Sequence, residues 1–147
     1  MRHARPLTGD DGSTLPLVIF FGLLSLLVIL GVVAATSLYL ERKRLFTLAD
    51  GAALVGAEAF DLAQVSVGAS GPRPTLNTEG VASAVRSYLA TVPTAEFDGL
   101  TLERAEALDG LSATVTLSAE WRPPVLEQLL PSGVRIDVTA VARSVFG

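Results

Sequence analysis

Few residues of this chain have side chains that could carry out catalysis. The sequence contains no cysteine and a single histidine, His3, which stands in a short polar tail. A Ser-His-Asp triad, a zinc site and a histidine general base each need an imidazole or a thiolate held in a folded domain. Carboxylates remain available, but no pair of them is spaced for general acid–base chemistry. We therefore expect no catalytic, cofactor-binding or metal-binding residue, and no enzyme.

The charge balance indicates which partners to expect. The chain has 11 Lys and Arg residues against 15 Asp and Glu, for a net charge of −4. Binding to a nucleic-acid backbone needs a basic face, and none is evident. We predict no nucleic-acid partner, no small-molecule substrate and no cofactor, which leaves membranes and other proteins as partners.

The longest apolar stretch runs from Ser13 to Leu40, 28 residues without a charge. A helix of that length reaches about 42 Å, enough to cross a hydrocarbon core of about 30 Å. The sequence therefore predicts a transmembrane helix over 13–40, after a polar leader over 1–12. A cleavable signal peptide is the alternative, but its apolar region is usually only about 7–15 residues long. The length favours an uncleaved anchor.

The helix is expected to continue past the apolar stretch. Glu41, Arg42, Lys43 and Arg44 form a charged collar, and no proline follows until Pro72. Small residues then recur at spacings of three and four, which predicts a helix extension over 41–63. They form one seam, made of Ala49, Ala52, Gly56 and Ala59. Either the chain's own domain covers this seam, or it is a close contact with another helix.

Residues 64–147 have the length of one small domain. A Gly-, Ser- and Pro-rich stretch over 64–77 predicts a surface loop. A second helix is expected from Glu79 to Thr91, with Asn77 or Thr78 as its N-cap and Pro93 after its end. A short helical turn is expected over Val125–Leu130.

The last third changes from helical periodicity to alternation. Every second residue from Leu111 to Trp121 is apolar, which predicts a half-buried strand. Asp109-Gly110 before it favours a two-residue type I′ turn, so Leu100–Leu108 should pair back antiparallel. A final strand begins at Val134.

The expected turn also sets the register of the hairpin. It places Leu102 and Leu108 on the face that carries Leu117 and Leu111, together with Arg104 and Glu106. The expected fold is α+β: a long N-terminal transmembrane helix that extends into a small domain with one further helix and about three antiparallel strands. The segment Leu45–Leu62 should cover one face of that sheet.

The residues after the apolar stretch also carry a resemblance. The sequence RKRLFTLADGAALVGAEAF follows a polar tip and an apolar helix, and it resembles a signature of the TadE/TadG-like proteins of the Flp (tight adherence) pilus assembly system. The resemblance covers about residues 11–63. The matching positions are Arg44, Leu45, Ala49, Asp50, Ala52, Ala53, Leu54 and Ala57.

The resemblance implies a pilin-like domain and a possible cleavage by a prepilin peptidase between Gly12 and Ser13. Processed pilins usually carry Glu at the fifth position after the cleaved Gly, where this chain has Leu17. This departure favours an intact leader. The resemblance also implies a cytoplasmic N-terminus and an extracytoplasmic domain. The positive-inside rule does not decide the orientation: Arg2, Arg5 and the amino terminus are about level with Arg42, Lys43 and Arg44, and by side chains alone the count leans toward a cytoplasmic C-terminal flank.

These observations lead to one expected function and two alternatives. The expected function is a non-catalytic, membrane-anchored pseudopilin or accessory component of an Flp-type pilus assembly or secretion apparatus, in contact with other subunits through helix packing. The first alternative is a single-pass membrane protein whose exported domain binds a ligand or partner outside any filament. The second is a secreted enzyme released from a signal peptide, with a mature start near Ser37.

Overall fold

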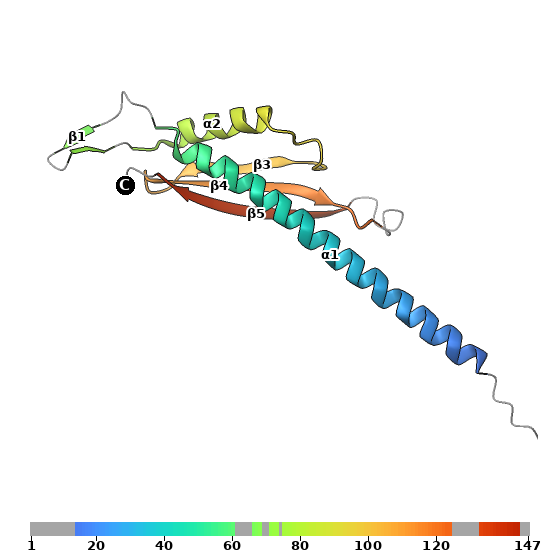
Figure 1. Ribbon diagram of the computed structural model, residues 1–147. Coiled ribbons are helices and arrows are strands. Elements are labelled where there is room, and N and C mark those ends of the chain that lie inside the picture. The colour runs from blue at the N-terminus through green and yellow to red at the C-terminus, as the bar shows by residue number, and fades with distance from the viewer. Residues whose placement is uncertain (1–13, 61–65, 69–70, 74, 125–132, 145–147) are drawn as a thin grey trace, which may run out of the picture. The chain divides into compact units, whose positions relative to one another are not determined.

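A computed structural model describes residues 14–60, 66–68, 71–73, 75–124 and 133–144 (Figure 1). The chain divides into two compact units, Met1–Val33 and Ala34–Gly147, which we describe separately. The predicted leader over 1–12, the bond between Gly12 and Ser13, and the turn over Val125–Leu130 lie outside the described residues.

Helix α1 runs from Leu15 to Ala57 without a break. Pro16 is tolerated because it occupies the first turn, where a backbone N–H has no helical partner. The helix ends earlier than the predicted limit of residue 63. The N–H of Ala59 bonds to the carbonyl of Gly56 at 3.2 Å, so the last turn tightens and the chain leaves the helix. Residues 61–63 lie outside the described part.

Helix α2 runs from Thr78 to Thr91 and confirms the second predicted helix. Asn77 is its N-cap, because its side-chain oxygen accepts a hydrogen bond from the N–H of Gly80 at 2.6 Å. Val81 and Val85, one turn apart, are fully buried. They therefore fix which side of α2 faces the core.

The predicted loop over 64–77 contains a short hairpin. Strands β1 (Ser66–Gly68) and β2 (Gly71–Arg73) pair antiparallel. Pairing satisfies backbone groups that a plain loop would leave to water. The sequence did not predict these strands because glycine and proline are depleted in strands. Pro72 is tolerated in β2 because β2 has a single partner strand in the described sheet.

The main sheet has three antiparallel strands in the order β3-β4-β5, as predicted. The strands are β3 (Thr101–Ala107), β4 (Ser112–Trp121) and β5 (Val134–Arg143). One face of β4 carries only apolar residues: Ala113, Val115, Leu117 and Ala119 are fully buried, and Trp121 at the end of the strand is half-buried. Val138, Ala140 and Ala142 of β5 continue this face and are buried as well.

The predicted register of β3 against β4 is wrong over most of the hairpin. Arg104 lies opposite Thr116 and Glu106 lies opposite Thr114, so both charges lie on the outer face of the sheet. Ala105 and Ala107 take the core face instead, opposite Val115 and Ala113. The shift is favoured because it removes two charges from the apolar face.

A β-bulge restores the predicted register beyond this point. The pairing shifts between Leu102 and Arg104, so Leu102 is again opposite Leu117. The extra residue is Glu103. In a bulge of this kind, two consecutive residues lie opposite a single residue of the partner strand. The extra residue allows both Leu102 and Ala105 to face the core.

The connection between β3 and β4 is not the predicted type I′ turn. That turn needs a positive φ at both central residues, and Gly110 has φ +69° while Asp109 does not have a positive φ. The Asp109 carboxylate instead accepts hydrogen bonds from the N–H groups of Leu111 and Ser112 at 2.9 and 2.6 Å. Leu108, predicted to face the core, is 72% exposed because the longer connection carries it past the end of the sheet.

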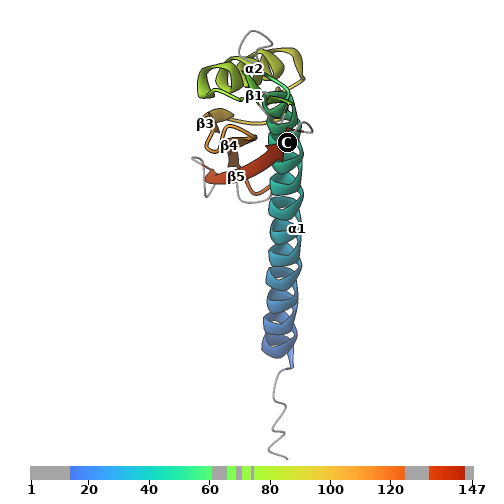
Figure 2. The same ribbon diagram turned by 90° about the vertical axis from the view of Figure 1, so that its left-hand side faces the viewer.

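The C-terminal part of α1 and helix α2 lie on the same face of the sheet (Figures 1 and 2). Their buried residues and the apolar face of β4 form a single core cluster. This confirms that α1 covers the sheet from Leu45 to Ala57, where the prediction had extended the covering segment to Leu62. A sheet of three strands is stable only when one face is covered in this way.

Candidate functional site: the apolar part of α1 and its basic collar

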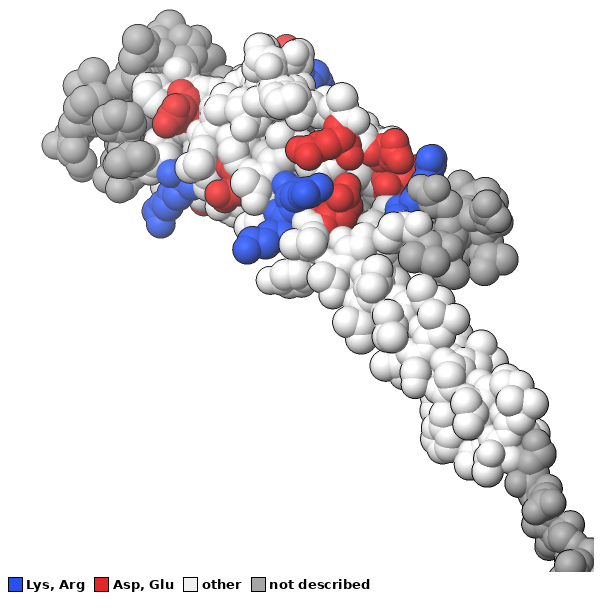
Figure 3. Space-filling view, turned by 45° about the vertical axis from the view of Figure 1, so that its right-hand side comes forward, with Lys and Arg blue, Asp and Glu red and all other residues white. Residues whose placement is uncertain are grey.

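The N-terminal unit consists, in its described part, of the apolar portion of α1. Its large side chains are exposed on all sides, as the consecutive residues Leu17, Val18, Ile19, Phe20 and Phe21 show with exposed fractions of 55–65%. A water-exposed helix would keep polar residues on one side. Figure 3 shows no charged side chain along this part of α1 on the face drawn. The helix is long and apolar enough to cross a bilayer, which suggests a membrane anchor.

The basic collar lies in the second unit, where α1 begins to pack on the sheet. Arg42, Lys43 and Arg44 are all exposed. None of the three takes part in an ion pair within the described part of the chain. Arg42, Lys43 and Arg44 therefore give the collar, which also contains Glu41, an excess of positive charge on a protein whose net charge is −4.

A groove of about 340 Å³ opens between this turn of α1 and strand β5. Tyr39, Arg42, Lys43 and Phe46 line it from α1, and Val138 and Thr139 line it from β5. β5 is an edge strand, because it pairs only with β4 in the described sheet. The groove brings together segments separated by more than ninety positions in the chain, so the sequence alone did not reveal it.

The predicted seam of small residues faces the chain's own domain. Ala49 and Ala52 are fully buried, Gly56 is buried and Ala59 is half-buried. A Cβ on Gly56 would lie 3.1 Å from Val81 of α2 and 3.2 Å from Ala113 of β4. The absence of a side chain at Gly56 therefore lets α1 approach α2 and the sheet closely. A role of the seam in contacts with another subunit stays a prediction.

The positions of the family signature divide into two groups. Leu45, Ala49, Ala52, Ala53 and Ala57 are buried in the core, whereas Arg44, Asp50 and Leu54 are exposed. Most of the signature thus has a packing explanation: small residues bring α1 close to the sheet. Within the described part of the chain, the exposed members take part in no ion pair.

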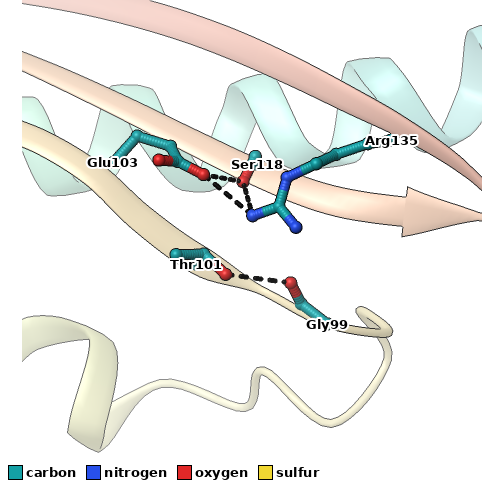
Figure 4. A network of polar contacts seen from close by, with 5 residues as sticks. All are labelled: Gly99, Thr101, Glu103, Ser118 and Arg135. Carbon is teal, nitrogen blue, oxygen red and sulfur yellow. Dashed lines mark hydrogen bonds and ion pairs between the residues drawn. The ribbon is translucent and has the colours of Figure 1, made fainter.

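A polar network on the outer face of the sheet was not predicted (Figure 4). Ser118, only 2% exposed, donates a hydrogen bond to a carboxylate oxygen of Glu103 at 2.6 Å. Arg135 donates to the same oxygen at 2.8 Å and to the Ser118 hydroxyl at 2.7 Å. The hydrogen bond from Ser118, followed by that from Arg135, lowers the pKa of Glu103 below its usual value. The network joins the bulge of β3 to β4 and β5.

This network has a structural explanation. Glu103, Ser118 and Arg135 each form hydrogen bonds with the other two, and these bonds hold Glu103, the extra residue of the bulge, in place. The described residues contain no group of three His, Cys, Asp or Glu side chains that could hold a metal ion. His3 lies outside the described part. The apolar part of α1 and the basic residues that follow it are suited to anchoring and docking.

Comparisons with known proteins agree with this view. Searches of curated proteins and of solved structures found no match to the chain. A family model described as "Putative Flp pilus-assembly TadE/G-like" matches residues 12–59, the stretch that holds the apolar helix, the collar and the small-residue seam. The match supports a role related to Flp pilus assembly. Residues 12–59 are therefore similar to the TadE/G-like proteins, and the resemblance inferred from the signature after the apolar stretch is confirmed.

Proposed function

We propose that this chain is a non-catalytic, membrane-anchored pseudopilin or accessory component of an Flp-type pilus assembly or related secretion apparatus. One observation carries the proposal. The family match over residues 12–59 coincides with a single helix that is exposed and apolar at its start and buried in a small domain at its end. A helix of this kind can hold a domain at a membrane and pack against other subunits.

Co-purification with the full chain tests the role in assembly. The chain, tagged after Gly147, is expressed in its native host, cross-linked and extracted in mild detergent. We expect other pilus-assembly subunits, such as the secretion ATPase and the polytopic platform proteins, among the recovered proteins. Recovery of the folded chain without any such subunit would contradict the proposal.

The proposed orientation is a cytoplasmic N-terminus and an extracytoplasmic domain. It rests on the family match, because the basic residues that flank the apolar stretch do not decide between the two orientations. Alkaline phosphatase fused after Gly147 should be active in cells, and a cytoplasmic reporter at the same site should be inactive. The reverse pair of results would establish the opposite orientation.

We propose that the leader over 1–12 stays attached and that the chain is a permanent anchor rather than a filament subunit. Leu17 stands where processed pilins carry Glu, which supports this choice. The mass of the protein extracted from membranes distinguishes the two cases. A mass that corresponds to a start at Ser13 would show processing by a prepilin peptidase and contradict the proposal.

A second candidate is a single-pass membrane protein whose exported domain binds a partner outside any filament. The outer face of the sheet supports it, because Arg135, Asp137 and Thr139 of β5 are exposed there. Co-purification separates the two functions: the second predicts recovery of a partner that is not a pilus-assembly subunit. Charge reversal at Arg135 and Asp137 should abolish that recovery and leave the membrane association unchanged.

A further inference from the structure

The groove between α1 and β5 is lined by two basic residues and by no carboxylate among the described residues. Arg42 and Lys43 line it, and neither makes an ion pair in the described chain. The nearest acid along the strand, Asp137, lines a neighbouring groove together with Arg135 and Arg42. Unpaired cations in a hollow attract an anion. The groove is thus suited to a negatively charged ligand.

The apolar walls of the groove indicate which anion. Tyr39 is 65% exposed and Phe46 is 47% exposed, so the two cations lie between aromatic rings in contact with solvent. Val138 adds an aliphatic surface from β5. A free ion such as phosphate carries no hydrocarbon that could pack against these apolar surfaces. An anion that carries hydrocarbon next to its charge can pack against them, and burial of that hydrocarbon adds favourable free energy of binding.

The position of the groove along α1 matches the membrane surface. The stretch Leu15–Thr36 has 22 residues, and at about 1.5 Å per residue it spans about 33 Å, the thickness of a hydrocarbon core. Arg42 follows about 9 Å later along the axis. The polar headgroup layer is about 5–8 Å thick on each side, and arginine and lysine side chains extend back toward it.

We propose that this groove binds an anionic phospholipid of the leaflet from which α1 emerges. Arg42 and Lys43 donate hydrogen bonds to the lipid phosphate, while Tyr39 and Phe46 pack against the glycerol and upper acyl region. The proposal rests on the anchoring of α1 in a bilayer and is independent of any role in pilus assembly. Lipid selection at this site would fix the depth and rotation of α1 where the domain begins.

Native mass spectrometry of the full chain tests the proposal. The protein is released from nanodiscs of phosphatidylcholine and phosphatidylglycerol mixed in equal amounts, and the retained lipids are counted. We expect retention of phosphatidylglycerol over phosphatidylcholine in the native chain. The double variant Arg42→Gln/Lys43→Gln should bind phosphatidylglycerol about thirtyfold more weakly, since each basic residue near an anionic surface contributes about fivefold to the affinity.

A matched control separates the groove from net charge. Arg86→Gln/Arg143→Gln also removes two positive charges, but at exposed positions of α2 and β5 that do not line the groove. This control variant should retain phosphatidylglycerol as the native chain does. Equal loss in both double variants would overturn the proposal. So would equal retention of the two lipids by the native chain. Carbonate extraction should leave all variants in the membrane, so a failure of lipid selection is distinct from a failure of anchoring.

Two further readouts identify other occupants. If inorganic phosphate displaces the bound phosphatidylglycerol, the groove recognises a free ion, and the lipid proposal is wrong. A photo-reactive amino acid in place of Phe46 reports the neighbour in living cells. A lipid adduct at this position supports the proposal, whereas an adduct with a protein segment would overturn it in favour of an acidic protein partner.

Discussion

The indole N–H of Trp121 donates a hydrogen bond to the hydroxyl of Ser37 at 3.2 Å. This bond joins the last residue of β4 to a position of α1 that lies within the charge-free stretch over 13–40. The folded domain therefore reaches α1 three positions before Leu40. The part of α1 that is available to span a bilayer accordingly ends before Ser37 and has about 22 residues.

Trp121 should lie at the boundary between lipid and water, where tryptophan is enriched in membrane proteins. It is the only tryptophan in the chain, so its fluorescence reports this site alone. In bilayers with brominated lipids, bromine near the glycerol end of the acyl chains should quench the emission more than bromine near the methyl end. Equal emission in brominated and ordinary lipids would show that the domain stands away from the membrane.

Gly56 should tolerate no large side chain. Gly56→Leu places atoms where Val81 and Ala113 already lie within 3.2 Å of a Cβ, so we expect a loss of about 1–3 kcal/mol or more in the free energy of unfolding. Gly56→Ala should be much milder, because a gain of about 1 kcal/mol in helix propensity offsets the crowding. Thermal unfolding of the full chain in detergent measures both effects.

Gly31→Leu is the control for this prediction, since no atom lies within 4 Å of a Cβ at Gly31. The melting temperature of Gly31→Leu should equal that of the native chain. If Gly31→Leu nevertheless loses co-purifying subunits, a second helix packs there in the assembly. Normal stability of Gly56→Leu would contradict the close packing of α1 on the sheet.

Glu103 should make the stability of the domain depend on acid pH. Its pKa is lowered in the folded state by the hydrogen bonds from Ser118 and Arg135. Its contribution is therefore complete above the unfolded value, about 4.3, and is lost as the pH falls through the lowered folded value. The melting temperature of Glu103→Gln should be below that of the native chain at pH 7, and the difference should shrink in acid.

Circular dichroism between about pH 3 and pH 7 measures this difference. Glu58→Gln provides the control, because Glu58 is exposed and makes no ion pair in the described chain. It should follow the native profile. A constant difference between Glu103→Gln and the native chain at all pH values would show that the carboxylate charge has no part in the network.

Asp109 should be required for the connection between β3 and β4. Its carboxylate accepts hydrogen bonds from the N–H groups of Leu111 and Ser112, which lower its pKa. Asp109→Ala removes both acceptors and should lower the melting temperature, whereas Asp109→Asn keeps one acceptor oxygen and should lower it less. Equal melting temperatures of the two variants would show that the backbone alone forms the turn.

The sequence by itself determined the elements whose burial follows a local period. The charge-free stretch, the small residues of α1 and the alternation of β4 each specify one helix or strand face, because side chains repeat every 3.6 residues in a helix and every 2 in a strand. The same logic predicted that the helix continues past the apolar stretch, and α1 does continue into the domain as far as Ala57. The sequence also carried the family resemblance, since the signature is a run of neighbouring residues directly after the apolar stretch.

Only the tertiary structure decided which segments meet. The register of β3 depends on Glu103, whose extra position is stabilised by Ser118 and Arg135 from two other strands. The groove depends on the approach of β5 to Arg42 and Lys43. The space available for a side chain at position 56 is limited by Val81 of α2 and Ala113 of β4. Each relationship joins residues that are distant in the chain, and a local pattern contains no information about the partner it will face.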